Sequence, residues 1–358
     1  MSTPVLAREE MEAVECVLRS GRLAQGAKVE EFEASFASYI GTKYAIATSS
    51  GTAALHIAFL ASGIGHGDEV ITTPFSFIAT ANAILFCGAR PVFVDIDKDT
   101  FCINPGLIRA KITSKTKAVL PVHLYGQPCN MKEIVRICRE HNLILIEDAC
   151  QAHGAEYSGK KVGSFGIGCF SFYPTKNMTT GEGGMILTAD SHIAERARMI
   201  RSHGQNGRYV HELLGYNYRM TDIAAAIGIC QLKKLDEFNR RRIEHARFLT
   251  ETLSNFCGLI TPFVTPDVKH VFHQFTIKVT GDFAMSRDEL KQRLKDRGIM
   301  TEVYYPLPIH KQPLYKELGY NVSMPNAGKA CAEVLSLPVH PLLTEEELDY
   351  IIETIRNI

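Results

Sequence analysis

The first half of the chain alternates short, almost entirely apolar segments with segments of helical periodicity, and few folds accommodate this alternation. The apolar segments lie at residues 69–72, 91–94, 118–122 and 143–146. Strands that lack an alternating polar face are typical of a parallel sheet covered by helices on both faces. We therefore predict an α/β architecture with helices between successive strands, including one over residues 105–112.

A long helix is predicted to connect two parts of the chain. It begins at Thr221-Asp222, where either residue is a plausible N-cap, and continues to residue 253. Beyond it, residues 272–279 alternate in the manner of a strand. Because 358 residues exceed the size of one ordinary core, we expect two domains. These are a large domain over residues 1–240, with an N-terminal helical segment, and a small α/β domain over residues 241–358.

Composition excludes several functional classes. Lysine plus arginine number 39 and aspartate plus glutamate number 39, so no overall field attracts nucleic acid or an anionic membrane. No apolar run approaches the roughly 20 residues of a membrane-spanning helix. The ten cysteines show no C-x-x-C spacing, so neither a zinc ribbon nor a redox motif is indicated, and we expect no metal site. With no signal-peptide pattern at the N-terminus, we expect a cytoplasmic protein.

Residues 169–187 contain the most informative motif. A short apolar strand is followed by Pro174, a lone Lys176 and the glycine-rich turn Gly181-Glu182-Gly183-Gly184, after which the chain becomes apolar again. A lysine in a partly dehydrated pocket has a lowered amine pKa and becomes a nucleophile that forms a Schiff base with a carbonyl, such as that of pyridoxal phosphate. Taken alone, the segment fits a surface lysine in a β-hairpin better.

Further features precede Lys176 and follow successive predicted strands. They are Ser49-Ser50-Gly51-Thr52 before a helix, then Phe77, Asp148 and Gln151. Amides at a helix N-terminus bind phosphate, an aromatic ring stacks on a planar cofactor, and a carboxylate at a strand end pairs with a pyridine nitrogen. Singly, each feature has a structural explanation that is as good or better, such as an N-cap or a core phenylalanine. Their order is the stronger evidence for a pyridoxal-phosphate site.

These residues lie within motifs that resemble the DegT/StrS family, the fold-type I pyridoxal-phosphate aminotransferases that act on nucleotide-linked sugars. The resemblance covers nearly the whole chain. Its motifs include Gly67-Asp68-Glu69-Val70-Ile71, Glu147-Asp148-Ala149-Cys150-Gln151, Tyr216-Asn217-Tyr218-Arg219 and Leu335-Ser336-Leu337-Pro338. The resemblance implies a large domain with a mostly parallel seven-stranded sheet between helices, followed by a small C-terminal α/β domain.

The family's cofactor roles carry over to the matching positions. Lys176 resembles the lysine that binds pyridoxal 5'-phosphate as a Schiff base, and Asp148 resembles the partner of the pyridine nitrogen. Phe77 and Gln151 resemble the residues on either side of the ring. The residues expected to bind the phosphate are Gly51, Thr52 and Ser171.

Other positions imply partners and substrates. Asn217 resembles the residue that reaches the phosphate of the neighbouring subunit, which implies a homodimer with shared active sites. Tyr305 and His310, in a proline-rich loop, are assigned to the substrate. His153 is expected to be a hydrogen-bonded structural histidine near the site.

The resemblance implies an aminotransferase of amino-sugar biosynthesis for surface polysaccharides or related glycans. The amino group would come from an amino acid, usually L-glutamate in this family, and go to a nucleotide-linked hexose with a keto group at C4 or C3. Some family members are dehydratases with a histidine in place of the lysine, so the presence of Lys176 favours transamination. Two alternatives stay open: a cyclitol (inosose) aminotransferase and a regulatory protein that binds the cofactor without turnover.

Overall fold

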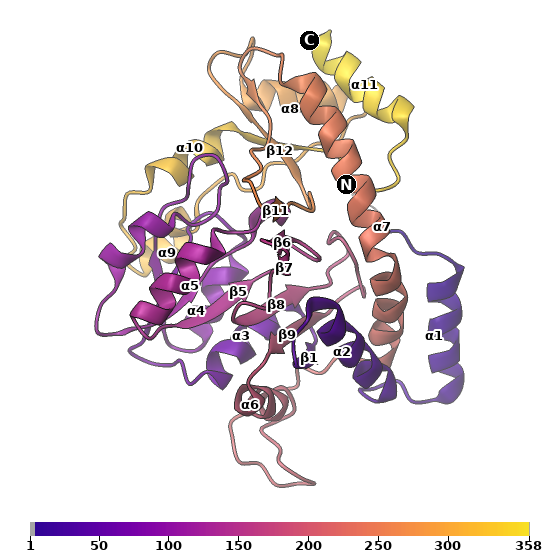
Figure 1. The fold of residues 1–358 in the computed structure, drawn as a ribbon, viewed down its shortest axis with the longest axis vertical. Helices are drawn as coiled ribbons and strands as arrows, with labels where there is room; N and C mark the ends of the chain where they lie inside the picture. The colour runs from indigo at the N-terminus through magenta and orange to yellow at the C-terminus, as the bar shows by residue number, and fades with distance from the viewer. Residues whose placement is uncertain (1–3, 358) are drawn as a thin grey trace.

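A computed structural model describes residues 4–357 of the chain. Its centre is a seven-stranded sheet with the strand order β1-β9-β8-β5-β4-β2-β3 (Figure 1). The strands are β1 (Tyr44–Thr48), β2 (Glu69–Thr72), β3 (Arg90–Phe93), β4 (Thr116–Leu120), β5 (Ile144–Asp148), β8 (Ile167–Ser171) and β9 (Gly184–Thr188). All neighbouring pairs are parallel except those of β9, which is antiparallel to β1 and β8. The predicted mostly parallel seven-stranded sheet is confirmed.

Helices cover both faces of this sheet, and the side chains of its strands alternate between two hydrophobic clusters. The helices are α3 (Gly51–Ala61), α4 (Ala79–Phe86), α5 (Met131–Glu140) and α6 (Ser191–Arg201). In β4, Ala118 and Leu120 pack with α3, α4 and α6, whereas Val119 packs with α5. Because each face is covered, consecutive strand residues are all apolar, which accounts for the pattern in the sequence.

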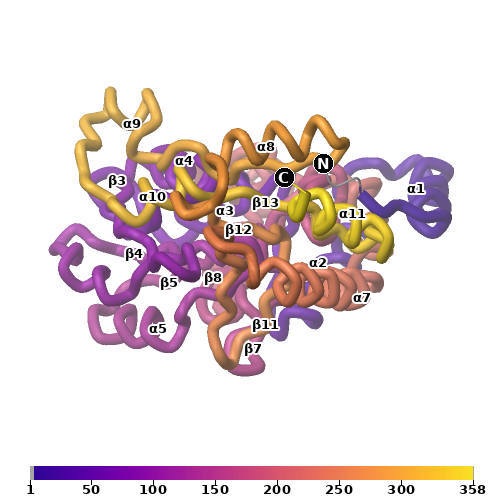
Figure 2. The backbone as a smooth tube through the Cα atoms, turned by 90° about the horizontal axis from the view of Figure 1, so that it is seen from above, coloured from indigo at the N-terminus to yellow at the C-terminus, as the bar shows by residue number. Residues whose placement is uncertain are grey.

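The helix α7 (Asp222–Leu253) connects the N-terminal helices to the C-terminal part of the chain (Figures 1 and 2). Thr221 is its N-cap and accepts a hydrogen bond from a backbone N–H of the first turn. Asp222 accepts hydrogen bonds from the backbone N–H groups of Gly26 (2.8 Å) and Val29 (3.0 Å), which join the start of α7 to that of α2. The N-terminal helices that pack against α7 are α1 (Arg8–Ser20) and α2 (Ala27–Ile40).

The C-terminal part contains a second sheet with the order β10-β12-β13, against which α8 and α10 pack. Its elements are β10 (Leu259–Ile260), β12 (Phe275–Val279), α8 (Arg287–Asp296), α9 (Pro313–Glu317), α10 (Pro325–Glu333), β13 (Val334–Leu337) and α11 (Glu345–Arg356). A third sheet consists of β6 (Glu156–Tyr157), β7 (Lys160–Lys161) and β11 (Val268–Lys269). The domain boundary near residue 240 stays a prediction.

One predicted helix has a different form. Residues 105–112 contain the 3-10 helices η1 (Pro105–Leu107) and η2 (Arg109–Lys111) where an α-helix is expected. The side chain of Asn104 accepts a hydrogen bond from the backbone N–H of Gly106 at 2.9 Å, and this local turn competes with a longer helix. The other 3-10 helices are η3 (Leu124–Gly126) and η4 (Ile309–Lys311). Within residues 4–357, no helix is both long and apolar enough to cross a membrane.

Candidate active site

Lys176 lies in the segment that joins the antiparallel strands β8 and β9, and its backbone N–H donates to the carbonyl of Tyr173 at 2.9 Å. The segment is a hairpin, but its lysine is partly buried rather than a solvated surface residue. Burial lowers the pKa of the Lys176 ammonium below its usual value, although Cys150 and Asp148 act in the opposite direction. A larger neutral fraction makes this amine a better nucleophile than that of an exposed lysine.

Asp148 is the last residue of β5, and its side chain is buried. The hydroxyl of Thr80 donates to Oδ2 at 2.8 Å, and the backbone N–H of Cys150 donates to Oδ1 at 3.2 Å. These hydrogen bonds replace part of the hydration that the carboxylate loses on burial. The arrangement places a carboxylate at the carboxyl end of a parallel strand, where ligands of such sheets bind.

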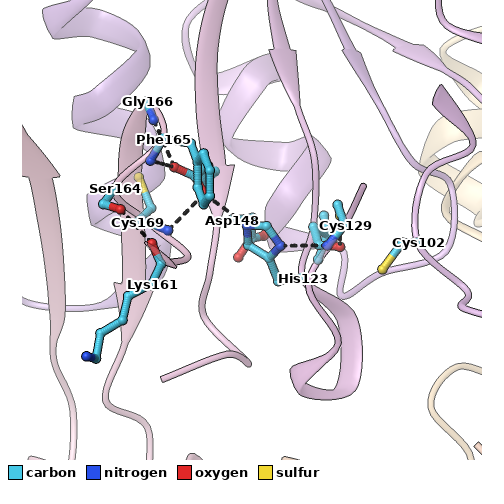
Figure 3. Close-up of polar contacts among 12 residues, drawn as sticks. Cys102, His123, Cys129, Asp148, Lys161, Ser164, Phe165, Gly166 and Cys169 are labelled. Atoms are coloured by element: carbon cyan, nitrogen blue, oxygen red, sulfur yellow. Dashed lines mark hydrogen bonds and ion pairs between the residues drawn. The ribbon is translucent and has the colours of Figure 1, made fainter. Parts of the chain in front are cut away.

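A buried network holds the backbone from which Asp148 projects (Figure 3). The carboxylate of Glu147 accepts a hydrogen bond from the backbone N–H of Gly166 at 2.9 Å and lies 3.1 Å from Nε2 of His123. The backbone N–H of Cys129 donates to Nδ1 of His123 at 3.1 Å. The hydrogen of the neutral imidazole is therefore on Nε2, where Glu147 accepts it.

Sequence reasoning missed the supporting residues Thr80 and Glu147. The signal for Glu147 is an acidic residue at the end of an apolar run, next to Asp148. The signal for Thr80 is absent from local sequence, because the hydrogen bond to Asp148 spans 68 positions of the chain.

The N-terminus of α3 lies directly against the end of β8. Ser50 is the N-cap, and its hydroxyl accepts a hydrogen bond from the backbone N–H of Ala53 at 3.1 Å. A Cβ atom on Gly51 would lie 2.6 Å from the Cβ of Ser171, so only glycine permits this approach. The first N–H groups of the helix, including that of Thr52, have no acceptor within the helix and favour an anion.

Two aromatic rings and an amide gather near Asp148. Gln151 accepts a hydrogen bond from the backbone N–H of Tyr125 at 2.9 Å and donates one to the hydroxyl of Tyr305 at 3.1 Å. The ring centroids of Tyr305 and Phe77 lie 6.4 Å apart. Phe77 is 58% exposed, which leaves its ring available to a planar ligand.

These groups fit pyridoxal phosphate. The amine of Lys176 suits an aldehyde, the buried carboxylate of Asp148 suits a protonated ring nitrogen, and the α3 N-terminus with the Ser171 hydroxyl suits a phosphate. The close approach of Gly51 to Ser171 distinguishes this helix N-terminus from that of an ordinary capped helix, because it brings a hydroxyl residue beside the N–H groups expected to bind the phosphate.

The remaining predicted residues lie in other surroundings. Asn217 is exposed in the single chain, and its backbone forms a bridge with Ser202. His310 is buried, with its ring centroid 6.2 Å from that of Phe93. Neither ring nitrogen of His310 has a hydrogen-bond partner among the described residues.

The expectation that His153 is hydrogen-bonded is wrong. Its side chain is buried, yet within residues 4–357 neither ring nitrogen has a partner. The ring packs against Phe170 and Phe172, with centroid distances of 5.2 and 5.7 Å. Burial, together with the charge of Lys176, lowers the pKa of His153 to about 3, so this imidazole is neutral at physiological pH.

Comparison with known proteins identifies the family. The model of the DegT/DnrJ/EryC1/StrS aminotransferase family matches residues 4–356. The chain belongs to this family. A protein of Geobacillus stearothermophilus named pleiotropic regulatory protein is 47% identical over 352 residues, which cover 97% of this chain and 93% of that protein. GDP-perosamine synthase of Caulobacter vibrioides is 41% identical over 96% of this chain and 94% of its own length.

A solved structure supports the same assignment and bears on the cofactor. The crystal structure of NtdA from Bacillus subtilis with the bound cofactor PMP has a TM-score of 0.89 and 35% sequence identity. The match covers 98% of this chain and 82% of that chain. A pyridoxal-type cofactor in a structure of the family is consistent with pyridoxal phosphate as the cofactor of this one.

The partial burial of Lys176 predicts a pH-dependent stability difference. Because burial lowers its pKa in the folded state, the unfolded chain binds more protons, and the penalty grows as the pH falls below the unfolded-state value of about 10.4. Lys176→Met should therefore raise the Tm of the cofactor-free protein at pH 7, by an amount that shrinks as the pH approaches about 10.4. Thermal unfolding across this range measures the difference.

Lys132→Met, at an exposed position on α5, is the matched control and should leave the Tm nearly unchanged at every pH. If Lys176→Met behaves like Lys132→Met, the lysine is not dehydrated in the folded protein.

Proposed function

We propose that this protein is a pyridoxal-phosphate-dependent aminotransferase that moves an amino group from L-glutamate to a nucleotide-linked keto-hexose. The observation that carries the proposal is the meeting of Lys176, Asp148 and the α3 N-terminus at one edge of the sheet. A 4-keto sugar is the favoured acceptor class, because the segments 179–184 and 153–156 resemble perosamine-type synthases. A GDP-perosamine synthase among the relatives supports this choice. A 3-keto sugar is the alternative.

The proposed mechanism divides the work among residues of this chain. Bound pyridoxal phosphate supplies a ring that withdraws electrons from the carbon next to the reacting nitrogen. Asp148 holds a positive ring nitrogen through its buried carboxylate. Lys176 binds the cofactor and then accepts and returns a proton at Nζ, a role that a lowered amine pKa favours. Phe77 and Gln151 would hold the ring from either side.

A regulatory role is the second candidate, because the relative from Geobacillus stearothermophilus is named as a regulatory protein. The presence of Lys176, Asp148 and Gln151 together favours catalysis. A protein that only binds the cofactor could also hold it through the amine of Lys176, but it has no need for a buried carboxylate that keeps the ring an electron sink. A cyclitol aminotransferase would use the same cofactor residues and differ only in the acceptor.

An acceptor panel tests the proposal. The purified protein with pyridoxal phosphate and L-glutamate is assayed against 3-keto and 4-keto hexoses linked to UDP, GDP or dTDP, and against an inosose. We expect amination of a nucleotide-linked 4-keto hexose, detected by mass spectrometry. Amination of the inosose alone would support the cyclitol alternative. Failure to convert glutamate to 2-oxoglutarate in the first half-reaction would contradict an aminotransferase with this donor.

We also propose a homodimer with shared sites. The loop after α6 projects from the body of the molecule (Figure 1), and its Tyr209 and Leu214 are 78% and 83% exposed. Large apolar side chains at this exposure are costly to leave in water and favour burial against a second copy. Asn217 follows this loop and is itself exposed, which suits a contact with the partner's phosphate.

Hybrid dimers test the shared site. Lys176→Ala and Asn217→Ala should each be nearly inactive alone. A dimer of one subunit of each kind contains one site with both lesions and one site with neither. Co-expression with two affinity tags should therefore restore activity to about half of the wild-type value per dimer, by this count of intact sites. If purified hybrids stay inactive, Asn217 acts in its own subunit.

A further inference from the structure

A cavity of about 360 Å³ lies beside the Lys176 segment but is not the site described above. It is bounded by α7, β13, α11 and the loop 298–304. Its lining includes Thr175, Arg242, His273 and Tyr304. Thr175 directly precedes Lys176, so a ligand in this cavity would lie beside the backbone segment that carries Lys176.

Arg242 on α7 brings a buried positive charge to the cavity wall. Its side chain is 3% exposed. One guanidinium nitrogen donates long hydrogen bonds to the carbonyls of Phe272 (3.3 Å) and His273 (3.5 Å), and Nε has no partner among the described residues. Burial lowers the pKa of Arg242 to about 10, so the group stays charged at neutral pH. A buried charge without a counter-ion is costly, so an anionic ligand that pairs with it would relieve that cost.

The two carboxylates in the cavity lining are engaged elsewhere. Glu302 pairs with Lys291 and accepts a hydrogen bond from the backbone N–H of Val303 at 2.9 Å. Glu347 accepts a hydrogen bond from the backbone N–H of Thr344 at 2.9 Å and so caps α11. Neither forms a salt bridge with Arg242, whose pKa is shifted by burial alone.

His273, in the cavity wall, links the cavity to the segment that carries Lys176. The amide nitrogen of the Asn177 side chain donates to the side chain of Asn239 at 2.8 Å. The amide oxygen of Asn177 is therefore free to accept a hydrogen bond from Nδ1 of His273 at 3.3 Å. Burial, assisted by the charges of Lys176 and Arg242, lowers the pKa of His273 and keeps it neutral. His340, also in the lining, has its pKa lowered by burial as well. Arg242 is therefore the strongest charge that the cavity offers a ligand.

We propose that this cavity binds a carboxylate of the amino-acid donor, with Arg242 as its anchor. A planar guanidinium matches a carboxylate in two parallel hydrogen bonds, and the ligand would neutralise the buried charge. The proposal rests on the proposed function, since it places the donor's carboxylate on the side of Lys176 that Thr175 and His273 border.

Equilibrium binding of glutarate, a dicarboxylate that lacks an amine, tests the proposal independently of turnover. Isothermal titration with the cofactor-loaded protein compares wild type with Arg242→Gln and with Arg241→Gln. Arg241 is the neighbouring arginine on α7; it is about half exposed and pairs with Glu237 at 2.8 Å. Arg242→Gln should weaken glutarate binding about tenfold or more, the value of a charge-assisted hydrogen bond. Arg241→Gln should leave it unchanged.

Equal glutarate affinity in Arg242→Gln and wild type would overturn the proposal. A parallel titration with GDP separates the donor from the sugar nucleotide, and loss of GDP affinity alone in Arg242→Gln would also overturn it. If Arg242→Gln does not fold, glutarate should slow the modification of wild-type Arg242 by phenylglyoxal, as read by peptide mapping, and absence of protection would contradict the anchor. If glutarate binds through Arg242 but glutamate is not converted, the proposed function fails while the carboxylate site stands.

Discussion

The buried carboxylate of Asp148 is the interaction on which the rest of the site depends. It raises the pKa of the thiols of Cys150 and Cys169, in each case adding to a larger effect of burial, and it attracts the ammonium of Lys176. A charge placed this deeply is costly unless its oxygens are satisfied. The hydroxyl of Thr80 and the backbone N–H of Cys150 satisfy them, so β5, α4 and the turn after β5 must meet at one point.

The elements around Asp148 hold the end of β5 in place. Glu147 ties the end of β5 to the segment that leads into β8, and His123 continues the network to the loop before α5 (Figure 3). On the other side of β8, Gly51 allows the N-terminus of α3 to approach Ser171. Asp148 and Ser171 end strands of the central sheet, and Gly51 and Thr52 begin α3, which favours precise positioning of the groups proposed to hold the ring nitrogen and the phosphate. Phe77 and Gln151 lie in the irregular segments that follow β2 and β5.

The sequence predicted the elements whose signal is local. Fully apolar strands indicated a sheet covered on both faces, and α7 begins at the N-cap that the sequence offered. The parts that could not be predicted depend on contacts between distant segments. The bond between Thr80 and Asp148 is one case, and the unpartnered ring of His153 between two phenylalanines is another. The burial of Arg242 is a third case, because only the tertiary fold shows it.

The central claim is that Lys176 is the residue that carries pyridoxal phosphate. Borohydride reduction of the protein with its cofactor, followed by proteolysis and mass spectrometry, fixes the pyridoxyl group to the amine that holds it. The account predicts the label on the peptide that contains Lys176, and its absence from that peptide in Lys176→Ala. A label on any other lysine, with Lys176 unmodified, would contradict it.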